Sequence, residues 1–202
     1  RAGDELWRDD QSILVASSYA PCGKARKVDG GWMVSGTWPT ASGSDHCEGG
    51  AFLGARVLDD EGNMVDHRSF LVSRADYELI DDWYVVGLAG TGSKTVKIKD
   101  EAFVPDFRSH SIVEYTMGHG PVSYRLPFNQ VFFGAVSSVI VGFANGIVDL
   151  FIEHMVPRQN VFVGGPVAAK NPFVQEKLGN AVLLIRSARA RVLQCIQEST
   201  AY

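Results

Sequence analysis

The chain has 202 residues, of which 46% are hydrophobic and 21% charged, and its formal net charge is −4. This length and balance are typical of a soluble globular protein with one large domain or two small ones. The slightly acidic charge gives no electrostatic basis for binding nucleic acid, so we expect no nucleic-acid partner.

The start of the chain and its cysteines indicate a cytoplasmic protein. No apolar core follows the basic Arg1, so residues 1–7 do not resemble a signal peptide. The three cysteines are too few, and odd in number, for a disulfide framework. A reducing compartment is therefore the expected location.

The first half of the chain is predicted to form short β-strands. Asp59–Asn63 is a turn sequence between two of the candidate strands. Apolar, β-branched or alternating runs occur at 12–19, 31–38, 51–58, 68–73 and 95–99. Several short strands at this spacing predict a sandwich or barrel, which we expect to be antiparallel.

Small polar residues gather at the end of the second predicted strand. Residues 40–46 follow Trp38 and combine glycines with hydroxyl side chains, which lets a flat ligand lie close to the backbone. Ser17 lies within the first strand and is either a structural serine or a hydroxyl offered to a ligand. His46 is either a polar residue near that ligand or a structural loop histidine.

Two other motifs resemble a phosphate-binding loop and a metal site but lack features that these sites require. Residues 87–95 resemble a phosphate-binding loop, but Ser93 separates the last glycine from Lys94 and a strand follows instead of a helix. We predict a tight turn into a strand. Asp45–Glu48 resembles a metal cluster, but adjacent residues of an extended segment point to opposite faces, so we predict no metal.

The second half is predicted to form two long helices. From Pro127 to Met155 the apolar residues recur at spacings of three and four, and Pro157 marks the end. A second helix is expected over about 172–199. Its inner stripe is predicted to contain Leu178, Val182, Ile185 and Val192.

The most apolar run, 131–148, is predicted to be a buried helix and not a membrane span. Glycines and Asn145 interrupt it, and we expect no membrane partner. Two helices alone make a poor bundle, because each buries a single stripe. We therefore expect a β domain over 1–115 and part of a helical bundle over 116–202, completed by further chain or by partner subunits.

Three stretches together resemble the acyl-CoA dehydrogenase superfold. Within it they are most similar to the oxygenase components of two-component, reduced-flavin-dependent monooxygenases, such as the p-hydroxyphenylacetate hydroxylase oxygenase. The amino-acid sequences of segments 42–46 and 90–95 favour these monooxygenases over the dehydrogenases. The three stretches are 15–24 with 31–43, 82–95 with 103–105, and 158–166.

The resemblance implies an α+β fold in which an antiparallel β-sandwich or barrel precedes the long helices of a bundle. It covers almost the whole chain but only part of a family member. A helical domain would precede Arg1 and further bundle helices would follow Tyr202. The resemblance also implies a homotetramer with flavin sites at its subunit interfaces.

The resemblance implies roles for individual residues. Ser42 matches the hydroxyl that bonds to flavin N5, and Ser17 matches a serine near the phenolic end of the substrate. Arg158 matches an arginine that reaches the flavin phosphate of a neighbouring subunit, and Phe162 an aromatic residue of the same loop. Thr40 stands where some relatives carry an aromatic residue.

The cofactor-binding set is therefore expected to be Ser42, Trp38, Thr40, Arg158 and Phe162. Substrate contacts are expected from Ser17 and His46, with Ser17 and Ser42 also in catalysis.

The implied activity is hydroxylation of a small aromatic or phenolic substrate through a C4a-hydroperoxyflavin. O2 is the cosubstrate, and reduced FMN or FAD comes from a separate flavin reductase. Three alternatives stay open on sequence grounds: an acyl-CoA dehydrogenase, an N-hydroxylating amino-sugar monooxygenase of the same fold, and a non-catalytic flavin-binding relative.

Overall fold

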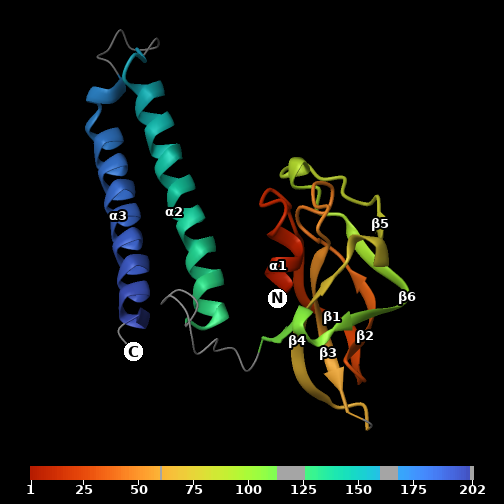
Figure 1. Cartoon of the computed structure of the whole chain (residues 1–202). Helices are drawn as coiled ribbons and strands as arrows, with labels where there is room; N and C mark the ends of the chain where they lie inside the picture. Colours follow the sequence, from red (N-terminus) through yellow and green to blue (C-terminus); the bar gives the residue numbers. More distant parts are fainter. Residues whose placement is uncertain (60, 113–125, 160–167, 201–202) are drawn as a thin grey trace. The chain divides into compact units, whose positions relative to one another are not determined.

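The computed structural model describes residues 1–59, 61–112, 126–159 and 168–200 (Figure 1). Contacts divide the chain into two compact units, residues 1–115 and 116–202. The first unit is a β-sheet preceded by a short helix, and the second is a pair of long helices.

The first unit contains one seven-stranded sheet, with the strand order β5-β6-β2-β1-β3-β4-β7. A short helix, α1 (Ala2–Trp7), precedes the sheet. The strands are β1 (Ala16–Val28), β2 (Gly31–Trp38), β3 (Ala51–Leu58), β4 (Met64–Val72), β5 (Glu78–Ile80), β6 (Thr95–Pro105) and β7 (Ser109–Ser111). The strands predicted at 31–38 and 51–58 are confirmed as β2 and β3 at the predicted bounds.

The prediction that the strands are all antiparallel is wrong at one pair, because β1 and β3 are parallel. β1 and β2 form an antiparallel hairpin through Gly30, whose φ of +72° suits a tight turn. β3 then lies on the other side of β1. A parallel neighbour requires a long crossover, and residues 39–50 provide it. The polar segment 40–46 belongs to this crossover.

Glycines in β1 and β2 make room for the largest core side chain. Trp38 is fully buried together with Phe70 and Leu53. A Cβ atom on Gly23 would lie 2.2 Å from Trp38 Cζ2, and one on Gly36 would lie 3.0 Å from Trp38 Cη2. The indole therefore occupies space that only glycine leaves open.

The second unit is formed by α2 (Phe128–Met155) and α3 (Pro172–Thr200), which lie side by side (Figure 1). Both predicted helices are confirmed. The four residues of the predicted inner stripe of α3 are half-buried, as a stripe facing α2 requires.

The expected burial of the apolar run is not found in this chain. No residue of α2 is buried, and exposed residues include Phe143 and Leu150, at 71% and 66%. The reason is that α3 covers only one stripe of a helix that is apolar nearly all round. Among the described residues, α2 is also the one helix long and apolar enough to cross a membrane by length and composition.

Candidate functional site

The crossover 39–50 is joined to the loop that precedes β6. The Ala41 N–H donates to Lys94 O at 3.1 Å, and the Gly43 N–H donates to Thr91 O at 2.9 Å. The buried Ser44 hydroxyl donates to the Gly92 carbonyl at 2.7 Å. As predicted, residues 87–95 form a turn that enters a strand, because the 3-10 helix Ala89–Thr91 leads into β6.

Charged groups hold the same two loops together. Lys94 Nζ lies 2.9 Å from Asp45 Oδ1 and 3.0 Å from Asp81 Oδ1. Lys94 donates to both carboxylates; these bonds, chiefly the one to Asp45, raise the pKa of Lys94, and the bond from Lys94 lowers the pKa of Asp81. The loop approaches so closely that a Cβ atom on Gly92 would lie 2.7 Å from Asp45 Cβ.

The structure brings the two predicted catalytic serines together. Ser17 and Ser42 form an isolated antiparallel bridge, in which the Ser17 N–H donates to Ser42 O at 3.4 Å. Residues directly opposite in an antiparallel pair project their side chains from the same face. Ser17 is half-buried and Ser42 is exposed, so this face of the pair is accessible from solvent at Ser42.

Sequence reasoning missed two hydroxyl residues behind Ser42. The buried Ser93 hydroxyl donates to Ser42 Oγ at 3.1 Å, and Thr91 Oγ1 lies 2.7 Å from Ser93 Oγ. Both belong to the glycine-rich segment that carried part of the resemblance. Its alternation of glycine and hydroxyl residues is the signal that could have identified them.

Trp38 is not a cofactor contact. Its side chain is 0% exposed, and its Nε1–H donates to Gly54 O at 2.6 Å. The indole therefore belongs to the core of the sheet.

Thr40 and His46 lie on the exposed side of the crossover. Thr40 has a φ of 58°, a left-handed conformation that turns the chain toward Ser42. His46 Nε2 lies 3.2 Å from Gly90 O, so the His46 ring donates to this carbonyl and ties the two loops together. The alternative of a structural loop histidine accounts for this contact.

Arg158 follows the end of α2 in the second unit and is exposed. Arg158 Nη1 lies 3.2 Å from His154 Nε2, and the backbone N–H of Arg158 donates to Met155 O. Within the described ranges, His154 is the one side chain that contacts the guanidinium, which leaves most of its donors available. Phe162 lies outside the described residues.

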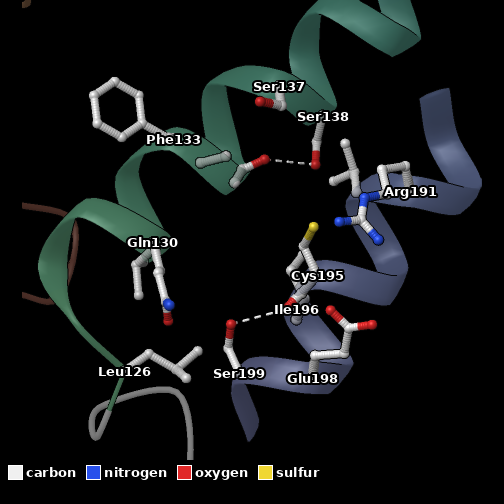
Figure 2. A pocket seen from close by; sticks show the side chains of 14 residues that line it. Leu126, Gln130, Phe133, Ser137, Ser138, Arg191, Cys195, Ile196, Glu198 and Ser199 are labelled. Carbon is white, nitrogen blue, oxygen red and sulfur yellow. Dashed lines mark hydrogen bonds between the residues drawn. The ribbon is translucent and has the colours of Figure 1, made fainter.

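A groove of about 770 Å³ lies between the start of α2 and the end of α3 (Figure 2). Two of its hydroxyls bond to their own helices, from Ser138 to Gly134 O and from Ser199 to Cys195 O. None of the predicted site residues lines it. Its mostly apolar wall suits packing against further helices better than it suits chemistry.

No family model matches the chain. The flavin-dependent monooxygenase oxygenase subunit HsaA of Mycobacterium tuberculosis is 36% identical over 209 residues, covering 100% of this chain and 52% of that protein. The p-hydroxyphenylacetate 3-hydroxylase oxygenase component of Acinetobacter baumannii is 29% identical over 195 residues, covering 93% and 45%. The chain thus spans about half the length of the curated relatives it matches.

Solved structures of flavin-dependent monooxygenases are also similar to this chain. The 3-HSA hydroxylase from Rhodococcus sp. RHA1 has a TM-score of 0.86 at 34% identity, covering 98% of this chain and 52% of its own. XiaF from Streptomyces sp., solved with FADH2 and glycerol, has a TM-score of 0.81 at 27% identity, with coverages of 99% and 52%. An acyl-CoA dehydrogenase from Geobacillus kaustophilus, at 14% identity and a TM-score of 0.68, shares the fold, with coverages of 98% and 54%.

The fold is therefore that of the acyl-CoA dehydrogenase-like flavoenzymes. Within this class, the chain is a homologue of the oxygenase components of two-component flavin-dependent monooxygenases that hydroxylate aromatic compounds, and it corresponds to about half of one. The resemblance seen in the sequence is confirmed.

Proposed function

We propose that the protein containing this chain is the oxygenase component of a flavin-dependent monooxygenase that hydroxylates a small aromatic substrate. The observation that carries the proposal is the pairing of Ser17 with Ser42, which places two hydroxyls on one face beside a glycine-rich loop. The homology over the whole chain supports the same activity.

The residues around Ser42 fit a flavin ring. Ser42 is exposed, and Gly43 after it has a φ of 84°, a left-handed conformation that favours glycine. Ser42 would hold N5 of the ring. When bound, the reduced flavin supplies the electrons that activate O2 for transfer to the aromatic substrate.

Ser17 would hold the phenolic oxygen of the substrate. No side-chain partner is found for its hydroxyl within the described ranges, so it is able to donate or accept. A hydrogen bond from the substrate to Ser17 would orient the ring beside N5. Arg158 would bind the flavin phosphate, because a guanidinium matches phosphate geometry.

The assembly is also part of the proposal. A separate reductase would supply reduced FMN or FAD, as the term oxygenase component implies for the relatives. We propose a homotetramer, as the resemblance implies, and the apolar surface of α2 that the described residues leave exposed would pack against further helices or partner subunits. The free cysteines Cys22, Cys47 and Cys195 suit a cytoplasmic location.

The test is to mix full-length protein with reduced flavin without oxygen, and then to add O2 with a panel of phenols. Hydroxylated product formed in step with flavin reoxidation is the expected result. The proposal fails if every phenol leaves only hydrogen peroxide, or if an acyl-CoA reduces the protein-bound oxidised flavin.

A further inference from the structure

Leu88 has a backbone conformation that glycine normally supplies. Its φ is 61° and its ψ is 26°, which is the left-handed region. A non-glycine residue in this region costs free energy, because its Cβ atom crowds the following carbonyl oxygen. Among the non-glycine residues that the structure describes, Thr40 alone shares a positive φ. Both strained residues belong to the two joined loops beside Ser42.

The side chain of Leu88 adds a second cost to the strained backbone. It is 76% exposed, so a large apolar group stays in contact with water. Gly92, in the same loop, also has a positive φ, and a Cβ atom there would lie 2.7 Å from Asp45 Cβ. Glycine at 92 is thus explained by the lack of space, whereas at 88 a large side chain is present although glycine would remove both costs.

Leu88 lies close to the candidate site. Its carbonyl accepts a hydrogen bond from Thr91 Oγ1 at 2.9 Å, and Thr91 Oγ1 lies 2.7 Å from Ser93 Oγ. Ser93 is in turn bonded to Ser42 at 3.1 Å. Two hydroxyl side chains therefore separate the backbone of Leu88 from the exposed Ser42. A fused ring system held at Ser42 spans such a separation.

Backbone bonds fix the position of Leu88. The Leu88 carbonyl also accepts from Trp83 Nε1 and from the Thr91 N–H, both at 3.1 Å. Asp82, beside Trp83, accepts from the N–H and the hydroxyl of Thr95 and so ties this loop to β6. None of these bonds involves the side chain of Leu88, which therefore has no part in holding the loop.

We propose that Leu88 is an apolar contact residue of the site, whose side chain packs against an aromatic ring bound beside Ser42. This inference rests on the proposed function, in which the flavin and the phenol each supply such a ring. Covering the side chain buries apolar surface, and this gain offsets the strain of the left-handed backbone. Because the loop is already held in place, the contact requires no rearrangement before the ring binds.

The first test compares the melting temperatures of full-length Leu88→Gly and Leu88→Ala. Glycine is less stabilising than alanine at an ordinary backbone position and more stabilising at a left-handed one. Leu88→Gly should therefore melt about 1 °C or more above Leu88→Ala. The matched control is the pair Val65→Gly and Val65→Ala, at an exposed apolar position of β4 without a positive φ, where the order should reverse.

The second test measures ligand binding by the same variants. Titration calorimetry without oxygen gives the dissociation constants of reduced FMN, and of 4-methylphenol at saturating reduced FMN. Leu88→Ala and Leu88→Gly should both weaken the binding of one or both ligands about 5-fold or more. Leu88→Met keeps a large apolar side chain and should keep the wild-type affinities, as should Val65→Ala. A loss for FMN identifies the flavin ring as the partner of Leu88, and a loss for the phenol identifies the substrate ring.

The outcomes separate this inference from the proposed function. Unchanged affinities for both ligands in Leu88→Ala and Leu88→Gly overturn the inference, and variants that still hydroxylate a phenol leave the function standing. A melting temperature of Leu88→Gly below that of Leu88→Ala overturns it by removing the strain. A fall of several degrees in both also overturns it, because another part of the full-length protein then covers Leu88. A wild-type protein that binds neither reduced FMN nor 4-methylphenol overturns both.

Discussion

Trp38 and Gly54 are joined across the strand that lies between theirs. The indole Nε1–H of Trp38 on β2 donates to the Gly54 carbonyl on β3 at 2.6 Å, and β1 separates these two strands. The bond is possible because the β1–β3 register shifts between Ser18 and Gly23, where Gly54 lies opposite the irregular part of β1. The indole thus bridges an interruption in the sheet.

Trp38→Phe should destabilise the protein without a specific effect on flavin binding. The change removes one buried hydrogen bond and part of a fully buried ring, for a loss of about 2–4 kcal/mol in the free energy of unfolding. Calorimetry measures the loss. Flavin titration of the folded variant should give the wild-type dissociation constant. A higher dissociation constant would indicate that Trp38 contacts the cofactor.

Gly23→Ala should destabilise the sheet by overpacking. The added Cβ atom would lie 2.2 Å from Trp38 Cζ2, and the indole is held in place by its bond to Gly54. We expect a loss of about 1–3 kcal/mol in chemical unfolding. The matched control is Gly87→Ala, where nothing lies within 4 Å and the change should stay within about 0.5 kcal/mol. Equal effects at the two positions would argue against close packing around the indole.

Asp82→Asn should lower stability at neutral pH but not in strong acid. The Thr95 hydroxyl and N–H both donate to Asp82, and these bonds lower the pKa of its carboxyl group. A lowered pKa in the folded state contributes stability above the unfolded value of about 3.9, and the contribution disappears as the pH falls through the folded value. The melting temperatures of wild type and variant should therefore differ at pH 7 and converge below about pH 4.

The control for this pH dependence is Asp100→Asn, at an exposed position of β6. Its melting temperature should follow that of the wild type across the whole range. A gap between wild type and Asp82→Asn that stays constant with pH would show that the carboxylate charge is irrelevant to the bond with Thr95.

Arg158→Ala should weaken the binding of FMN by about 10-fold or more, because a charge-assisted bond to phosphate is lost. Riboflavin lacks the phosphate, so its affinity should be the same for wild type and variant. Equilibrium titration of the full-length protein with both ligands measures the difference. A variant that loses affinity for riboflavin to the same extent would show that Arg158 does not act on the phosphate.

The elements with strong local patterns were predicted well. β2 and β3 match the predicted runs 31–38 and 51–58, and α2 and α3 repeat their apolar residues at helical spacing. The three-residue strands β5 and β7 were missed, because segments this short carry no periodicity of their own. The second half of β1 was missed because its exposed positions carry Lys24, Arg26 and Lys27.

The sequence by itself determined the fold class, the two long helices and the segment that carries Ser42. Periodicity and short sequence motifs are properties of residues that are neighbours in the chain, so they can be read without the structure. Only the tertiary structure decided that Ser17 lies opposite Ser42, that Ser93 and Thr91 stand behind it, and that Trp38 belongs to the core. These relationships depend on the crossover from β2 to β3 and on the loop before β6. Both join residues far apart in the chain, so no local pattern encodes them.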